Sequence, residues 1–168
     1  MTSPSDQGSS LIETVVASAL MLVVIGGLGS MGVVGMMTTE NQGHLAARTT
    51  EYAQDKMEQL LVLAWGDSTS DTRVFPAAGS GGTGLSVGGS ANPTAPVAGY
   101  ADYLDKSGTL IATTSGSAPA GWFYKRVWAV SSPMANLKQI EVTVTVESSL
   151  GRMAPPRSTV TSLKTFPF

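Results

Sequence analysis

The chain has 168 residues, a formal net charge of −2 and no cysteine. That length accommodates one modest domain and one membrane-length segment, and it is short for a large enzyme. The lack of cysteine excludes a disulfide framework and cysteine metal sites, and the negative net charge argues against a protein dominated by nucleic-acid binding.

The first feature along the chain is an apolar run from Leu11 to Met37, in which Glu13 is the only ionisable side chain. As a helix at ~1.5 Å per residue this run is about 40 Å long, more than the ~30 Å hydrocarbon core of a membrane requires. It is too long for a secretory signal peptide, and no Lys or Arg precedes it. The run therefore predicts a membrane-spanning helix that contains one carboxylate.

Glu13 is the candidate functional residue of this run, because an unpaired carboxylate in lipid costs several kcal/mol. Cleavage after Gly8 would create an α-amino group at Ser9, four residues before Glu13. Alternatively, Glu13 lies in the headgroup region at the start of the helix, where an acid suits the helix dipole. The spacing alone leaves both interpretations open.

The residues around Glu13 also carry a resemblance. Gly8-Ser9-Ser10-Leu11-Ile12-Glu13, followed by an apolar helix, resembles the class III signal of type IV prepilins and type II secretion pseudopilins. The resemblance implies that a prepilin peptidase cleaves between Gly8 and Ser9, removing residues 1–8 as a leader, and methylates Ser9. It also implies that Glu13 pairs with the N-terminal amine of a neighbouring subunit during filament assembly. Ser9 stands where the family has Phe, and the leader has no Lys or Arg.

Helical periodicity continues through residues 38–66. Apolar residues recur at helical spacing and are separated by charged ones, including Asp55 and Lys56, as an amphipathic helix requires. We therefore expect one long helix, with residues 9–37 in the membrane or filament core, residues 38–66 packed on a domain, and Gly66 as its stop. The apolar positions are Leu45, Tyr52, Met57, Leu60 and Ala64.

Residues 67–121 are rich in Gly, Ser, Thr, Ala and Pro and predict loops, with a β-hairpin at residues 100–113. Asp102 and Asp105 are weak candidates for a calcium site, although two loop carboxylates more often cap turns. No metal and no cofactor is predicted from the sequence.

Residues 122–168 predict an antiparallel sheet. Strands are expected at residues 122–131, 138–148 and 157–165, where apolar and polar residues alternate. Such a meander would bury one face of each strand on the second half of the helix and leave the other face in solvent. The expected fold class is α+β, and the resemblance makes it pilin-like, with a long N-terminal helix packed on a small antiparallel sheet.

The strands and the helix segment Ala53–Glu58 look like those of the V-type minor prepilins, the type IV pilus modification proteins. The resemblance is close at residues 8–65, moderate at residues 100–147 and absent between them. It implies a bacterial single-pass inner-membrane protein with its head in the periplasm, which later joins a pilus or pseudopilus. The implied partners are a prepilin peptidase, other pilins or pseudopilins contacted through the N-terminal helix, and the inner-membrane assembly platform.

Three hypotheses for function remain open: a minor pilin that assembles or primes a type IV pilus, a minor pseudopilin of a type II secretion system, and a tip pilin that binds DNA or a surface ligand. The third rests on an excess of basic over acidic residues after Trp122, although a solvated sheet face or a subunit interface explains that excess better than a DNA-binding surface does. With no cysteine and with His44 as the single histidine, interpreted as a solvated helix residue, we expect neither an enzyme nor a small-molecule substrate. The basic residues are Lys125, Arg126, Lys138, Arg152, Arg157 and Lys164.

Overall fold

The computed structural model describes residues 6–112, 118–147 and 155–166, and for residues 6–10 and 37–41 it describes the backbone alone. The chain divides into two compact units, Met1–Gly43 and His44–Phe168. Part of the expected leader, residues 1–5, and the candidate basic residue Arg152 lie outside the described residues.

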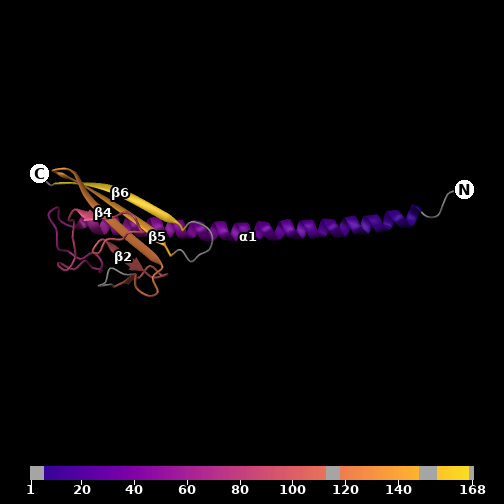
Figure 1. The fold of residues 1–168 in the computed structure, drawn as a ribbon, viewed down its shortest axis with the longest axis horizontal. Helices are drawn as coiled ribbons and strands as arrows, with labels where there is room; N and C mark the ends of the chain where they lie inside the picture. The colour runs from indigo at the N-terminus through magenta and orange to yellow at the C-terminus, as the bar shows by residue number, and fades with distance from the viewer. Residues whose placement is uncertain (1–5, 113–117, 148–154, 167–168) are drawn as a thin grey trace. The chain divides into compact units, whose positions relative to one another are not determined.

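One helix, α1 (Asp6–Val62), begins in the first unit and ends in the second (Figure 1). Its stretch Leu11–Met36 is long and apolar enough to cross a membrane, and none of that stretch is buried within the structure. This length and composition confirm the predicted helix of membrane-spanning length. A helix that is apolar on all sides requires apolar surroundings.

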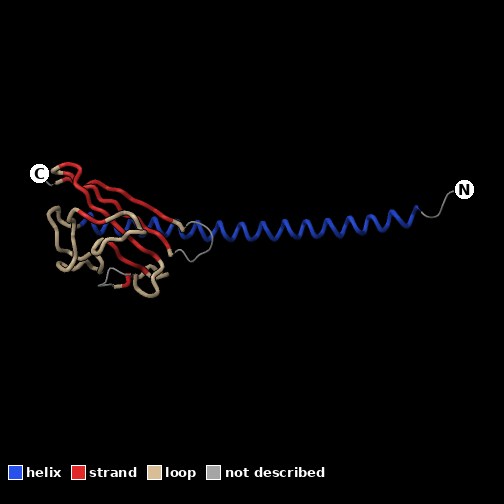
Figure 2. Tube along the Cα trace, viewed as in Figure 1, coloured by secondary structure: helices blue, strands red, loops and turns tan. Residues whose placement is uncertain are grey.

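The second unit contains a six-stranded antiparallel sheet with the order β3-β2-β4-β5-β6, in which β1 also pairs with β4. The predicted hairpin corresponds to β2 and β3, and the predicted meander to β4, β5 and β6. Strand β1 was not predicted, because its two glycines carry no strand pattern. Figure 2 shows that most of the chain between α1 and β2 is loop. The strands are β1 (Gly88–Gly89), β2 (Ala101–Leu104), β3 (Leu110–Ile111), β4 (Tyr124–Met134), β5 (Leu137–Val146) and β6 (Arg157–Thr165).

The part of α1 in the second unit packs on one face of this sheet. Met57 and Leu60 are buried on the helix, as the amphipathic pattern predicts, and so is Ala53. The predicted position Ala64 lies beyond the end of the helix and is exposed. The rings of Tyr52 and Tyr124 meet edge to face with their centroids 4.8 Å apart. The α+β class, with a helix packed on an antiparallel sheet, is confirmed within this unit. The buried sheet residues in the same cluster include Tyr124, Trp128, Val130, Ile140, Val142, Val144 and Val146.

Helix α1 ends at Val62 and not at the predicted Gly66. Its last turn contains no basic residue of its own, but Lys164 Nζ on β6 donates to the carbonyls of Leu61 and Leu63, each at 2.5 Å. The last carbonyls of a helix lack partners within the helix and carry partial negative charge. Lys164 supplies a donor for Leu61 in the last turn and for Leu63 just beyond the helix, and the helix ends without a glycine cap.

The sheet face opposite the helix is more buried than the sequence predicts. Val127 and Thr143 point to that face and are fully buried. Lys125 Nζ donates to Pro93 O at 3.0 Å, and Arg157 Nη2 donates to Ala91 O at 3.3 Å. The prediction that this face is solvated is wrong here, because part of the Gly- and Ser-rich segment folds across it.

Candidate functional site

The N-terminal motif lies at the start of α1. Gly8 and Ser9 belong to the backbone of its first turns, and Glu13 follows on a helix whose neighbouring apolar side chains are exposed. Glu13 is itself exposed, and no ion pair or hydrogen bond joins its carboxylate to a described residue. Both interpretations of Glu13, the partnered carboxylate and the interfacial one, fit this placement.

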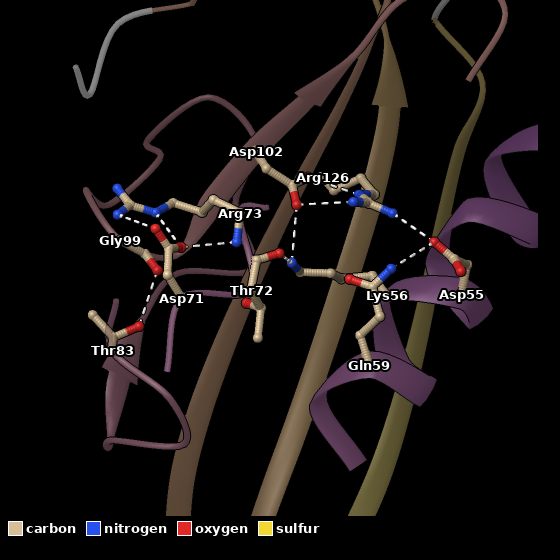
Figure 3. A network of polar contacts seen from close by, with 10 residues as sticks. All are labelled: Asp55, Lys56, Gln59, Asp71, Thr72, Arg73, Thr83, Gly99, Asp102 and Arg126. Atoms are coloured by element: carbon tan, nitrogen blue, oxygen red, sulfur yellow. Dashed lines mark hydrogen bonds and ion pairs between the residues drawn. The ribbon is translucent and has the colours of Figure 1, made fainter. Parts of the chain in front are cut away.

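The second unit contains a buried charge network (Figure 3), which we define as Asp55, Lys56, Asp102 and Arg126. The side chains of Lys56 and Asp102 are 0% exposed and that of Arg126 is 2% exposed. Arg126 donates from Nε and Nη2 to the two oxygens of Asp102, at 2.7 and 2.9 Å. Lys56 Nζ lies 2.9 Å from the same carboxylate. Such pairing is what allows charges to leave water, since each isolated ion would cost several kcal/mol.

Asp55 forms the outer end of the network. Its side chain is 54% exposed, and its Oδ2 accepts from Arg126 Nη1 at 2.9 Å and from Gln59 Nε2 at 3.1 Å. The two cations and two carboxylates of the network compensate one another. Because these four residues come from α1, β2 and β4, the network joins the helix to the sheet.

Lys56 also ties a loop to this centre. Its Nζ donates to the carbonyl of Thr72 and lies 4.1 Å from the centroid of the Trp128 ring, in a cation–π contact. Trp128 is fully buried, and its Nε1 is a buried side-chain atom without a hydrogen-bond partner among the described residues. One lysine thus connects the helix, the loop that follows it and the aromatic core.

Burial and charge act in opposite directions on the pKa values in this network. Burial lowers the pKa of Lys56 from 10.5 to about 8, although the carboxylate of Asp102 opposes that change. Burial alone would raise the pKa of Asp102, but Arg126 and Lys56 outweigh it and hold the pKa below the ordinary 3.8. A lysine with a lowered pKa can serve as a base or nucleophile. Lys56 is 0% exposed and held by Asp102, so its geometry fits a structural role.

Two members of this network had a signal in the sequence that periodicity reasoning missed. The amphipathic pattern counts Lys56 among the polar positions of the helix, yet its spacing from Tyr52 and Leu60 places it on the buried face. Arg126 alternates with Tyr124 and Trp128 and so shares their buried face. A charged residue at a core position of the helix, and another at a core position of a strand, could have indicated that both Lys56 and Arg126 are buried.

The two carboxylates proposed for calcium have separate roles. Asp102 has both oxygens engaged by Arg126 and Lys56. Asp105 Oδ1 accepts from Ser107 N at 2.8 Å, Ser107 Oγ at 2.6 Å and Thr109 N at 2.9 Å, and it thereby caps the hairpin turn. Within the described ranges, no three His, Asp or Glu side chains gather in a way that could hold a metal ion.

The basic residues that suggested a DNA-facing surface bind acceptors within the second unit. Arg126 belongs to the buried network, and the other described members donate to main-chain carbonyls. His44 is exposed on α1, as predicted. The excess of positive charge therefore has a use within the fold. The residues that donate to main-chain carbonyls are Lys125, Lys138, Arg157 and Lys164.

No protein-family model, no curated protein and no solved structure matches this chain. The fold itself defines an α+β chain with an N-terminal helix of membrane-spanning length and an antiparallel sheet. Any finer assignment of class rests on the N-terminal motif, Gly8 to Glu13.

Proposed function

We propose that this chain is a minor pilin, a structural subunit of a type IV pilus that takes part in assembling or priming the filament. The observation that carries the proposal is the Gly8-to-Glu13 motif at the start of α1. The helix that follows is exposed and apolar over Leu11–Met36 and then packs on an antiparallel sheet within the second unit. An apolar, exposed helix segment suits lipid first and the helical core of a filament afterwards.

In this proposal the carboxylate of Glu13 sets the order of events. A prepilin peptidase cleaves between Gly8 and Ser9 and methylates the new amine of Ser9. In the membrane, the carboxylate is costly because it lacks an opposite charge. Assembly brings the N-terminal amine of a neighbouring subunit to Glu13, and the resulting ion pair favours the assembled state over the free one.

The proposal also assigns partners and a location. The unassembled subunit is a single-pass protein of the bacterial inner membrane with its folded unit in the periplasm. In the inner membrane it meets the peptidase, the assembly platform and other pilins. It contacts the other pilins through the exposed helix segment. The alternative of a minor pseudopilin in a type II secretion system uses the same motif and the same helix. Neighbouring pilus-assembly genes would favour the first function, and neighbouring secretion genes the second.

The intact mass of the membrane-extracted protein tests the proposal. In cells with an active prepilin peptidase, we expect loss of residues 1–8 and a gain of one methyl group, whereas cells without the peptidase should keep the leader. Gly8→Ala should block cleavage, because its Cβ would obstruct close approach of the backbone to the peptidase. Gly26→Ala is the matched control, since a Cβ there meets nothing within 4 Å. Retention of the leader by the unaltered chain in peptidase-positive cells would overturn the proposal.

A further inference from the structure

Residues 91–98 form a loop whose two ends attach to the same residue of the sheet. Ser90 N donates to the carbonyl of Trp128 at 3.1 Å, and Trp128 N donates to the carbonyl of Tyr100 at 3.0 Å. The loop thus leaves β4 and returns to it at one point, as an Ω-loop does. We call residues 91–98 the lid. Because its ends are fixed side by side, the lid can move outward without displacing the strands.

A glycine with a positive φ adjoins each end of the lid. The φ of Gly89 is +83° and that of Gly99 is +84°, a region that residues with a side chain rarely adopt. Thr83 Oγ1 donates to Gly99 O at 3.0 Å, and Gly89 pairs with Ala129 in the sheet, so both glycines are anchored. Hinge residues absorb large changes in φ and ψ, which glycine permits more readily than other residues. The two glycines are therefore suited to act as hinges.

Two side chains hold the lid on the sheet. Lys125 Nζ donates to Pro93 O at 3.0 Å, and Arg157 Nη2 donates to Ala91 O at 3.3 Å. The other hydrogen bonds that the lid makes among the described residues lie within residues 90–100. Of the lid residues, all of which the structure describes, only Pro93 is buried. Opening of the lid therefore breaks two hydrogen bonds and exposes one proline, whereas the pairing of the strands stays intact.

The lid crosses the outer face of the sheet, opposite the helix. Lys125 and Arg157 lie in one row of that face, because each of them is a register partner of Thr145 on β5. Val127 and Thr143 are register partners between this row and the base of the lid on β4. Both are 0% exposed. The path of the lid from its base toward Arg157 thus accounts for the burial of this strip of the sheet.

We propose that the lid opens as a unit about its two hinge glycines while the sheet stays folded, and that Lys125 and Arg157 hold it closed. The open state exposes Val127 and Thr143. It also frees the ammonium group of Lys125 and the guanidinium group of Arg157, which the closed state engages with neutral carbonyls. The lid therefore controls access to a strip of the sheet that is flanked by two cations. This device lies in the second unit and is independent of the N-terminal motif on which the proposed function rests.

Thiol labelling of the full chain tests the lid, because the sequence has no cysteine and a single introduced one reports on its own site. Val127→Cys places a thiol under the lid. Val142→Cys is the matched control, since Val142 is equally buried but belongs to the core on the helix side of the sheet. In the detergent-solubilised chain we expect Val127→Cys to react at least about tenfold faster than Val142→Cys, because local opening requires less free energy than global unfolding.

The dependence on urea distinguishes the two routes of exposure. Low urea concentrations should accelerate labelling of Val142→Cys and leave that of Val127→Cys nearly unchanged, because opening of the lid exposes little surface. Thr143→Cys, under the lid on the neighbouring strand, should behave like Val127→Cys and guards against a distortion caused by one substitution. Equal rates for the thiols on the two faces, rising together with urea, would overturn the proposal.

Arg157→Met tests what holds the lid closed. In the Val127→Cys chain it should raise the labelling rate about fivefold, the change that corresponds to the loss of one ordinary hydrogen bond. Lys106→Met is the control, because it removes a cation from an exposed turn that does not contact the lid. Labelling of Val142→Cys should be unaffected by either change. A labelling rate of Val127→Cys that Arg157→Met leaves unaltered would overturn the proposal.

Discussion

The two units treat a carboxylate among apolar residues in opposite ways. Glu13 in the first unit is exposed and has no partner among the described residues. Asp102 in the second unit is completely buried and contacts both Lys56 and Arg126. Isolating a charge from water costs free energy in either setting. In the second unit, Lys56 and Arg126 offset that cost for Asp102. In the first unit, Glu13 has no such partner among the described residues, so an opposite charge has to come from outside the unit.

Apolar side chains show the same difference. Every side chain from Leu11 to Met36 is exposed, whereas Ala53, Met57 and Leu60 of the same helix are buried against the sheet. Burial of this kind stabilises a fold by about 25 cal/mol per Å² of apolar surface. We therefore expect the free energy of unfolding of the second unit to depend on its own core and charge network, and to be insensitive to the first unit.

The largest expected effect comes from Asp102→Asn. The substitution leaves two buried cations facing a neutral amide, and removal of one partner from a buried ion pair costs about 3–5 kcal/mol. Urea unfolding of the detergent-solubilised chain, followed by the fluorescence of its tryptophans, measures the loss. Asp105→Asn is the control, because its carboxylate caps an exposed turn and its loss should matter less. Equal losses for the two variants would show that the network does not dominate the stability of the second unit.

The same variant should alter the response to acid. Because the pKa of Asp102 is held below 3.8 in the folded state, its contribution to stability is present above that pH and is lost as the pH falls further. The wild-type chain should thus lose stability more steeply than Asp102→Asn below this value. Parallel acid profiles would contradict the charge state assigned to Asp102.

Lys56→Met should produce a smaller loss, because it leaves the bidentate contact between Arg126 and Asp102 intact. Its diagnostic result is a pH dependence. Between pH 8 and 10.5 the unfolded chain binds the Lys56 proton more tightly than the folded chain does. The free energy of unfolding therefore increases as the pH rises through this window. The stability of the wild type relative to Lys56→Met should increase across that window. A flat difference would mean that burial does not lower the pKa of Lys56.

Lys164→Met tests the end of the helix and should cost about 1 kcal/mol, the usual scale for a cation at a helix C-terminus. The loss arises because the carbonyls of Leu61 and Leu63 give up their donor. Lys164→Arg retains donors and charge and should recover most of the stability in the same unfolding measurement. If both variants were equally destabilised, packing of the lysine stem would be the cause, and not its hydrogen bonds.

The sequence predicts much of this fold, because local patterns carry the information. Leu11–Met36 reads as a membrane-length helix from composition alone, and β4 and β5 alternate clearly enough to give their faces and pairing. The buried network was missed for a physical reason. Periodicity rules assign charges such as Lys56 to the surface, and only the pairing of β2 with β4 brings Asp102 opposite Arg126.

The covering of the outer sheet face also depends on contacts that are distant in sequence. The segment Ala91–Pro93 has no strand or helix pattern, and it is held by Lys125 and Arg157, which lie 32 and 66 residues from their respective acceptors. No local signal reports such contacts. The motif at Gly8 and Glu13 differs in this respect. It is recognised from the sequence, whereas the structure of the single chain gives Glu13 no partner among the described residues.

Glu13→Gln should have no effect on the stability of the second unit, and this makes it the sharpest test of the difference between the units. A neutral amide is less costly in lipid than a carboxylate, so membrane insertion and removal of residues 1–8 should proceed normally. If the amine of a neighbouring subunit is the partner of Glu13, the variant should be depleted from sheared filaments, because the assembled state alone supplies the opposite charge. The measurement compares cleaved protein in the membrane fraction with its amount in filaments, using Glu58→Gln on the exposed side of α1 as the matched control. Filament content equal to that of the wild type would return Glu13 to the interfacial interpretation, in which an acid at the start of the helix serves the helix dipole.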